Sequence, residues 1–308
     1  MTTRLYTHPA CLQHDMGAGH PESPARLQAI LAALAAPDFE CLERAEAPLA
    51  GIDQIARAHP LAYVEGILKS VPRAGRVALD ADTTLSPGSG EAALRAAGAV
   101  CAAVDAVASG EAANAFCAVR PPGHHAEPMT AMGFCLFNNV AIGAHQARAV
   151  HGLRRAAVVD FDVHHGNGTQ AMFQSDPEFF YASTHQMPLY PGTGAARETG
   201  VGNICNAPLP PNAGSAEFRA AMAERVLPAL ADFRPDIILI SAGFDAHRAD
   251  PLANLALETD DYAWATDELL AVADRHCQGR LVSALEGGYD LAALAASTAA
   301  HVRRLMAA

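Results

Sequence analysis

The stretch VVDFDVHHGNGT, residues 158–169, decides the fold of this chain. It begins as an apolar strand, and successive side chains of a strand point to opposite faces. This alternation is expected to place Asp160, Asp162 and His164 together at the end of the strand, before the Gly-Asn-Gly turn at 166–168 breaks it. Carboxylates beside apolar residues are costly to bury unless they are paired or bind a metal. We therefore interpret the stretch as a buried strand end that carries metal ligands, rather than as a polar turn.

The composition limits the class of protein. The 308 residues are 51% hydrophobic but only 6% aromatic, which predicts a large core of closely packed helices. A net charge of −12 argues against a nucleic-acid surface and is compatible with a cationic substrate. The seven cysteines are scattered without a C-x-x-C pair, which favours a reducing, cytoplasmic location. The N-terminus lacks a signal-peptide core, and the most apolar run, 92–108, is expected to be too short to span a membrane.

Buried strands alternate with amphipathic helices along the chain. Strands are expected around 5–6 and over 116–119, 153–160, 178–184 (alternating), 236–241 (buried on both faces) and 281–285. Helices are expected from about 23, over 52–70 in two segments, and over 91–109, 140–150, 168–174, 215–233, 260–277 and up to about 304. The alternation predicts an α/β fold with a parallel sheet covered on both sides. Because no linker or repeat is visible, we expect a single domain over residues 1–308.

Polar clusters follow four of the predicted strands. They are the pair His124-His125, the stretch 160–164, Asp245 and Tyr289. In a parallel sheet these strand ends lie at one edge and can meet in one crevice. A further polar segment, HDMGAGHPESPARL (14–27), is either the rim of that site or an irregular N-terminal cap, and the sequence leaves both readings open.

The three residues Asp162, His164 and Asp245 offer two carboxylates and one imidazole. Three protein ligands leave a position for water, which is typical of a catalytic metal. Zn²⁺ is favoured, and Fe²⁺, Co²⁺ or Mn²⁺ would also suit an oxygen-rich set.

The neighbouring side chains suit hydrolysis. One histidine of the pair could take a proton from the metal-bound water, oriented by Asp160 or Asn167. Tyr289 could donate its hydroxyl to an oxyanion. These parts predict metal-assisted amide hydrolysis, although an ester or a guanidine would fit the geometry equally well.

Six motifs, in order from His20 to Asp290, now resemble one family: HPESPARL, RPPGHHA, GFCLFNN, VVDFDVHHGNGTQ, SAGFDAH and LEGGYD. They resemble the histone deacetylase / acetylpolyamine amidohydrolase family. Asn167 and the LEGGYD ending are similar to its class II branch. The resemblance implies an arginase/deacetylase-like three-layer fold, with a central, mostly parallel sheet flanked by helices. It also implies zinc-dependent removal of acyl groups from an amine.

The resemblance assigns a role to each catalytic position. The zinc ligands would be Asp162, His164 and Asp245. His125 would be the general base and then the general acid, oriented by Asn167. His124 would be an electrostatic helper, hydrogen-bonded to Asp160. Tyr289 would polarise the acyl carbonyl.

The resemblance also implies a substrate tunnel and a second cation. Gly133 would accept a hydrogen bond from the substrate nitrogen, and Phe134 and Tyr190 would wall an acyl-lysine tunnel. Asp82 would grip substrate backbone amides at the rim. A structural monovalent cation, usually potassium, would be bound, in several cases through backbone oxygens, by Asp160, Asp162, His164, Ser183 and Thr184.

Two departures from the family bear on the substrate. Leu252 lies where polyamine-selective members carry a glutamate, and the chain lacks room for the long rim insertion of bacterial polyamine enzymes. Both favour an acyl-lysine or neutral acyl-amine, whereas the acidic net charge favours a cationic substrate. An acetylpolyamine amidohydrolase, a non-catalytic acyl-lysine-binding module and a ureohydrolase are the alternatives. We expect no nucleic-acid or membrane partner, and homo-oligomerisation stays open.

Overall fold

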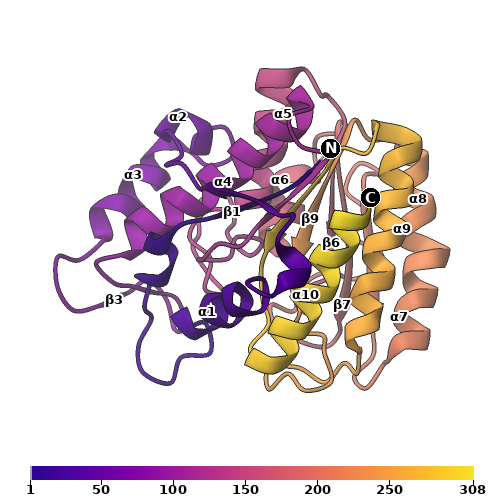
Figure 1. Cartoon of the computed structure of the whole chain (residues 1–308). Helices are drawn as coiled ribbons and strands as arrows, with labels where there is room; N and C mark the ends of the chain where they lie inside the picture. The colour runs from indigo at the N-terminus through magenta and orange to yellow at the C-terminus, as the bar shows by residue number, and fades with distance from the viewer. Residues whose placement is uncertain (1) are drawn as a thin grey trace.

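The computed structural model describes residues 2–308 and is built on one sheet (Figure 1). Its eight strands are β1 (Thr3–Thr7), β2 (Glu43–Glu46), β5 (Asn114–Cys117), β6 (Ala156–Asp160), β7 (Phe179–Gln186), β8 (Ile204–Leu209), β9 (Ile237–Ala242) and β10 (Leu281–Leu285). They lie in the order β2-β1-β5-β10-β9-β6-β7-β8, and every neighbouring pair is parallel. A separate antiparallel pair joins β3 (Val77–Ala78) to β4 (Thr84–Leu85). The predicted parallel α/β sheet is confirmed.

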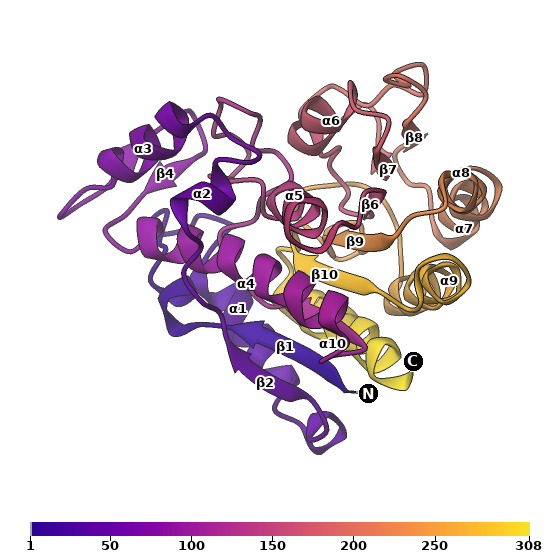
Figure 2. The same ribbon diagram turned by 90° about the horizontal axis from the view of Figure 1, so that it is seen from above.

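Helices cover both faces of the sheet. They are α1 (Pro24–Ala33), α2 (Ile52–Ile55), α3 (Leu61–Ser70), α4 (Ser89–Ser109), α5 (Asn139–His151), α6 (Asn167–Phe173), α7 (Ser215–Ala221), α8 (Leu227–Phe233), α9 (Thr259–Cys277) and α10 (Leu291–Ala307). Helices α4 and α5 pack on one face, while α1, α10, α9 and α8 cover the other, giving three layers (Figure 2). A π-helical turn, Met222–Val226, joins α7 to α8, so the helix predicted over 215–233 is continuous.

The central strands are buried on both faces. Every residue of β6, β7, β9 and β10 is buried. The alternating pattern predicted for β7 is therefore wrong, and its two phenylalanines explain why. Phe179 stacks on Phe173 of α6 with ring centroids 4.5 Å apart, and Phe180 stacks on Phe233 of α8 at 5.2 Å. Each face of β7 thus has its own apolar cover.

The decisive strand, β6, ends at Asp160 as predicted, but the side-chain alternation expected beyond it is absent. Alternation was expected to continue to His164, but the strand ends at Asp160 and a turn follows. The reason is local hydrogen bonding. Asp160 Oδ1 accepts from the Asp162 N–H at 3.1 Å, and Asp162 Oδ1 accepts from the His164 N–H at 2.9 Å. Such bonds from a carboxylate to the backbone two residues ahead compete with the sheet ladder, so a turn rather than strand alternation positions these side chains.

Two edge strands escaped prediction. β2 reads ERAE, which has no apolar alternation, and β8 reads ICNAPL, which contains Pro208. Both lie at the ends of the sheet order, where one side of the strand has no neighbour. An edge strand tolerates proline, and charged edge strands discourage pairing with other chains. The charged residues of β2 and the proline of β8 thus explain both why the sequence pattern did not predict these strands and why they lie at the edges of the sheet.

Helix α4 is longer than the apolar run that the sequence indicated. It has 21 residues and is long and apolar enough, by length and composition alone, to cross a membrane, so the expectation that it is too short is wrong. In the fold, 67% of its most apolar stretch is buried. It packs against α5 and against β1, β5 and β10. Its apolar surface is therefore used inside the protein.

Gly98 allows α4 to contact the segment before α2 directly. A Cβ at this position would lie 2.0 Å from the Pro48 carbonyl oxygen and 2.7 Å from the Ala50 nitrogen. Alanine is the better helix former by about 1 kcal/mol, but here it would push on backbone that cannot rotate away. We expect Gly98→Ala to lower the free energy of unfolding by roughly 1–3 kcal/mol, measured by urea denaturation.

The matched control is Gly66→Ala in α3, where a Cβ would meet no atom within 4 Å. This substitution should raise the free energy of unfolding by up to about 1 kcal/mol. Equal effects of the two substitutions would show that helix propensity, and not close packing, determines the stability at Gly98.

Candidate active site

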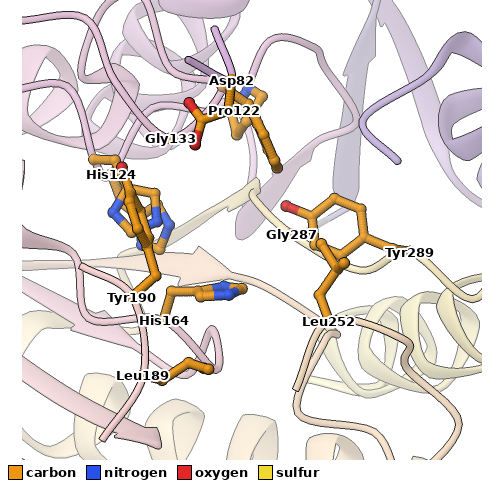
Figure 3. A pocket seen from close by; sticks show the side chains of 12 residues that line it. Asp82, Pro122, His124, Gly133, His164, Leu189, Tyr190, Leu252, Gly287 and Tyr289 are labelled. Carbon is orange, nitrogen blue, oxygen red and sulfur yellow. The ribbon is translucent and has the colours of Figure 1, made fainter. Parts of the chain in front are cut away.

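A pocket of about 250 Å³ opens at the carboxyl edge of the sheet. Its lining includes the five residues that the resemblance assigned to the substrate, which are Asp82, Gly133, Phe134, Tyr190 and Leu252. Tyr289 and Leu252 lie on one side of the pocket and face Tyr190 and His124 on the other (Figure 3). Segments far apart in sequence therefore meet here, as the strand-end argument predicted.

The three candidate metal ligands converge at the floor of this pocket. His164 Nδ1 lies 3.1 Å from Asp162 Oδ1 and 3.1 Å from Asp245 Oδ2. One ligand atom from each residue lies within 4.8 Å of the others, and all three residues are buried. Backbone N–H groups hold the carboxylates in place: Gly287 donates to Asp162 Oδ2 and Val163 to Asp245 Oδ1, both at 2.8 Å.

Electrostatics at this cluster favour a bound cation. Burial, and then the charge of Asp162, raise the pKa of Asp245 to about 7. Burial alone would lower the pKa of His164, but its hydrogen bonds to both carboxylates raise it to about 10. Two carboxylates and an imidazole in a dry site thus require a positive charge between them, and a divalent ion with an open coordination position meets that requirement.

Glycines form the wall behind the ligands. A Cβ at Gly243 would lie 2.0 Å from Asp162 Oδ2, and one at Gly287 would lie 2.1 Å from Asp245 Oδ2. Any larger residue would displace a ligand carboxylate. The donor set and the space around it therefore fit a catalytic divalent metal.

The adjacent histidines of RPPGHH bind two different partners. The His124 Nδ1 atom lies 2.9 Å from Asp160 Oδ2, which also accepts the Tyr181 hydroxyl at 3.0 Å. The His125 Nδ1 atom lies 2.9 Å from Asn167 Oδ1. The ring centroids of the histidines are 4.0 Å apart. Both rings therefore reach one site from the turn after β5, with their Nδ1 atoms held from behind.

Their environments drive the pKa values of the two histidines apart. Burial, with the nearby charges of His124 and His164, lowers the pKa of His125 well below its usual value. Burial would also lower the pKa of His124, but the carboxylates of Asp160 and Asp162 raise it well above the usual value. Near neutral pH, His125 is therefore neutral and able to accept a proton, whereas His124 is charged.

Tyr289 and Gly133 complete the pocket wall. Burial raises the pKa of Tyr289 well above its usual value, so the phenol keeps its proton and can donate it in a hydrogen bond. The Tyr289 N–H donates to Asp250 Oδ2 at 2.7 Å, which fixes the loop. At Gly133, a Cβ would lie 2.5 Å from His125 Cδ2, so the backbone there rests directly against the imidazole.

Glu286 supports the histidine turn and was not identified from the sequence. It is fully buried, and its Oε2 accepts from the N–H groups of Gly123 at 2.6 Å and His124 at 3.1 Å. Its Oε1 accepts from the Ser241 hydroxyl at 3.1 Å. A glutamate directly after the apolar strand β10 was the available signal, because a charge in that position needs partners.

The segment 14–27, left open between a rim and a cap, both rims the pocket and supports it from below. His20 Nε2 lies 3.1 Å from the Asp82 carbonyl oxygen, and its ring centroid lies 4.7 Å from that of Phe134. Beneath the pocket, Arg26 donates to the Gly288 carbonyl at 2.6 Å and to the Glu286 carbonyl at 2.5 Å. The loop that carries Tyr289 is therefore bound to the first helix of the chain.

A buried ion network holds Arg26 in place. Glu22 accepts from Arg26 Nη1 at 3.0 Å and from Arg120 Nη2 at 2.6 Å, and none of the three side chains is exposed. Burial alone would raise the pKa of Glu22, but the Arg120 guanidinium, with His14 and Arg26, lowers it to about 2. The carboxylate therefore stays charged in the folded protein throughout the physiological pH range.

The residues expected around a monovalent cation lie on neighbouring strands. Asp160 of β6 is paired in register with Ser183 of β7. The Ser183 hydroxyl lies 2.9 Å from His185 Nδ1, and the Thr184 hydroxyl is buried without a hydrogen-bond partner. Asp162 and His164 follow in the turn after β6. The structure thus brings the β6 and β7 parts of the proposed site together.

We expect Glu22→Gln to lower the free energy of unfolding at pH 6 by roughly 3–5 kcal/mol, because it leaves two buried guanidiniums without a counter-charge. The pKa of Glu22 falls from 4.5 to about 2 on folding, so its stabilisation is complete above pH 4.5 and is lost as the pH falls towards 2. Urea denaturation should therefore show the difference between the two proteins shrinking from pH 6 to pH 3.5.

Glu65→Gln is the control, since Glu65 forms an exposed i,i+4 pair with Lys69. Such a pair contributes about 0.3–0.5 kcal/mol. A Glu22→Gln difference as small as this, or one independent of pH, would contradict the network.

Comparison with known proteins identifies the family. A model of the histone deacetylase domain matches residues 20–305. "Histone deacetylase 14, chloroplastic" of Arabidopsis thaliana is 41% identical, covering 98% of this chain and 76% of the relative. "Histone deacetylase-like amidohydrolase" of Pseudomonas aeruginosa is 42% identical, covering 91% and 75%, and a "Probable deacetylase" of Archaeoglobus fulgidus is 39% identical, covering 94% and 82%.

A solved structure agrees with this assignment. The crystal structure of the HDA15 HD domain superposes with a TM-score of 0.93 at 34% identity, covering 100% of this chain and 90% of that one. The predicted arginase/deacetylase-like three-layer fold is thereby confirmed. The chain belongs to the histone deacetylase family of deacetylases and amidohydrolases.

Proposed function

We propose that this protein is a zinc-dependent amidohydrolase that removes acetyl or other acyl groups from lysine side chains or related amines. The observation that carries the proposal is the convergence of Asp162, His164 and Asp245 at the floor of a pocket. Beside this point lie a neutral imidazole, His125, and a protonated phenol, Tyr289. These are the groups that hydrolysis of an unactivated amide needs.

Zinc held by Asp162, His164 and Asp245 would polarise the acyl carbonyl and lower the pKa of bound water. Two carboxylates and one imidazole would also suit Fe²⁺ or Co²⁺. We propose that the backbone oxygens and hydroxyls around Asp160, Ser183 and Thr184, with those of the following turn, hold a structural potassium ion.

The chain's own groups would move the protons. His125 accepts the proton of the attacking water at Nε2, because its Nδ1 faces Asn167, and later delivers that proton to the leaving amine. The charged His124, held by Asp160, places a positive charge behind the reacting carbon. The Tyr289 hydroxyl donates a hydrogen bond to the oxyanion that develops on the acyl group.

The pocket walls would orient the substrate. Phe134 and Tyr190 line the pocket and would enclose an extended aliphatic chain. The Gly133 carbonyl would accept the N–H of the scissile amide, and Asp82 at the mouth would accept substrate backbone N–H groups. Leu252 lines the same pocket without a charge, which favours a neutral group near the reacting end over a second ammonium.

A second candidate function is hydrolysis of acetylpolyamines, and the mouth of the pocket supports it. Burial, and then the charges of Asp82, Asp80 and Glu127, raise the pKa of Tyr190. Three carboxylates therefore act on the outer wall of the tunnel. They would attract a distal ammonium group of a substrate by simple Coulombic interaction.

We propose that the enzyme works in a reducing compartment as a single catalytic domain. All seven cysteines are free, which supports a reducing compartment such as the cytoplasm. We further propose that residues 1–308 act as one catalytic domain without a nucleic-acid or membrane partner. The acidic net charge supports the absence of nucleic-acid binding.

We expect the zinc-reconstituted protein to release acetate from an acetyl-lysine coumarin reporter, and a chelator to abolish turnover. His125→Ala should lower kcat by roughly 10²–10⁴-fold, because the proton acceptor is lost. His276→Ala, which removes an exposed histidine of α9, is the control and should change nothing. Activity that survives both chelation and His125→Ala would overturn the proposal.

Two other outcomes would assign a different class. Tight binding of acetyl-lysine peptides by zinc-loaded protein without turnover would indicate a non-catalytic binding module. Release of urea from arginine or agmatine would indicate a ureohydrolase.

A substrate panel separates the two candidate substrates. We expect acyl-lysine peptides to be hydrolysed with a higher kcat/KM than acetylputrescine or acetylspermidine, because Leu252 offers no charge to a distal amine. Leu252→Glu should shift the ratio of kcat/KM values towards acetylspermidine by about tenfold, equivalent to about 1.4 kcal/mol. A preference of the unchanged protein for polyamines would mean that the carboxylates at the mouth, and not Leu252, determine the substrate.

A further inference from the structure

The amide of Asn167 lies between the proposed general base, His125, and the carboxylate of Glu127. Asn167 Oδ1 lies 2.9 Å from His125 Nδ1. On its other side, Asn167 Nδ2 donates to Glu127 Oε1 at 2.8 Å and to Met132 Sδ at 3.3 Å. Glu127 is half-buried. A chain of three side chains thus leads from a carboxylate to the imidazole.

The direction of the hydrogen bond between Asn167 and His125 matters because His125 is neutral. A neutral imidazole carries one proton, on either Nδ1 or Nε2, and only the unprotonated nitrogen can act as a base. With Oδ1 facing the ring, Asn167 accepts the proton of Nδ1 and leaves Nε2 free. If the amide turned over, its NH₂ would donate to Nδ1, and the ring proton would move to Nε2, where it prevents base catalysis.

Backbone contacts fix the segment that carries Asn167 against the segment that carries His125. Rotation of the Asn167 amide is then what determines which of its atoms faces the imidazole. The Thr169 N–H donates to the His124 carbonyl at 3.2 Å. The Asn138 side-chain NH₂ donates to the Ala126 carbonyl at 3.3 Å. A Cβ at Gly168 would lie 2.2 Å from that same carbonyl oxygen, so the two backbones are in direct contact. The amide of Asn167 is therefore held at a fixed place and only its orientation remains to be set.

Glu127 and Met132 set that orientation, since Glu127 Oε1 and the Met132 thioether both accept from the Asn167 NH₂ group. Both therefore select the NH₂ group of Asn167. Glu127 is itself held by backbone hydrogen bonds with Thr130 in both directions, at 3.0 Å and 3.4 Å.

We infer that Glu127 is a positioning residue, which orients the Asn167 amide and thereby keeps the ring proton of His125 on Nδ1. The inference rests on the proposed role of His125 as the base, but the proton position can be measured without turnover. For this role, residue 127 must accept a hydrogen bond from the Asn167 NH₂ group, but it does not need to carry a negative charge. If residue 167 is instead a carboxylate, it can accept hydrogen bonds both from His125 and from residue 127. A hydrogen-bond donor at position 127 should then preserve activity.

The test is a cycle of four zinc-reconstituted proteins: unchanged, Glu127→Lys, Asn167→Asp and the double variant. We expect Glu127→Lys to lower kcat on the acetyl-lysine reporter by about 10–100-fold with little change in KM. Asn167→Asp alone should also lose activity, because it places two carboxylates side by side. The double variant should be more active than either single variant, since the carboxylate introduced at position 167 then accepts from both the introduced lysine and His125.

The direct readout is the ¹⁵N shift of the His125 ring, assigned by its absence in His125→Ala. Nδ1 should carry the proton in the unchanged protein and in Glu127→Gln, whose amide oxygen can still accept. In Glu127→Lys the proton should lie on Nε2. If Glu127→Lys does not fold or hold zinc, Glu127→Leu removes the acceptor without adding a donor, and both tautomers should then appear. Glu40→Lys, at an exposed position, controls for the change in net charge.

Several outcomes would overturn the inference. These are an Nδ1 proton retained in Glu127→Lys or as the single form in Glu127→Leu, a double variant no better than Glu127→Lys, or a loss confined to KM for cationic substrates. The last would make Glu127 a substrate-binding residue of the rim. If the unchanged protein turns over no acyl-lysine, the proposed function fails, whereas the ¹⁵N shifts still decide the role of Glu127.

Discussion

The repulsion between the buried carboxylates of Asp162 and Asp245 is the constraint on which the site depends. Both lie in a dry environment beside His164, and the pKa of Asp245 is raised accordingly. Backbone N–H groups and a glycine wall hold the two carboxylates at this spacing although they repel each other. Because the fold supplies this arrangement from the segments after two separate strands, the proposed divalent cation would find its three ligands already close together. The cost of holding the two carboxylates together is therefore part of the free energy of folding, before any ligand binds.

The charged side chains around this centre are each paired with a group of opposite charge. Asp160 holds a charged His124 on one side, while burial and the nearby charges of His124 and His164 keep His125 neutral. Beneath the pocket, Glu22 neutralises two arginines, and one of them holds the loop of Tyr289 through its carbonyl groups. Each group near the reacting centre thus has its protonation state determined by a specific neighbour. A pocket lined by many titratable side chains can in this way place one neutral imidazole, His125, and one protonated phenol, Tyr289, beside the metal ligands.

Sequence analysis recovered the features that follow from strand ends and motif chemistry. The parallel sheet, its central strands and the place where Asp162, His164, Asp245 and the two histidines meet could all be predicted, because buried strands and dense polar turns leave strong patterns. The edge strands β2 and β8 could not, since exposed edges select charge and proline over apolar alternation. Nor could the turn over residues 161–164 that replaces the expected strand alternation, because it depends on carboxylates that accept hydrogen bonds from nearby backbone N–H groups. Several contacts of Glu22, Arg26 and Glu286 join residues more than 90 positions apart, and a single sequence carries no record of such pairs.

The position of β10 has a consequence for how the protein is made. Among the strands that the structure describes, β10 is the last in the sequence, yet it lies in the middle of the sheet, between β5 and β9. Until it leaves the ribosome, the nascent chain holds two half-sheets, β2-β1-β5 and β9-β6-β7-β8, each with an open central edge. Such edges pair readily with other chains. Shielding by a chaperone, or rapid release of the finished chain, should therefore matter more for this protein than for one whose final strand lies at the rim of its sheet.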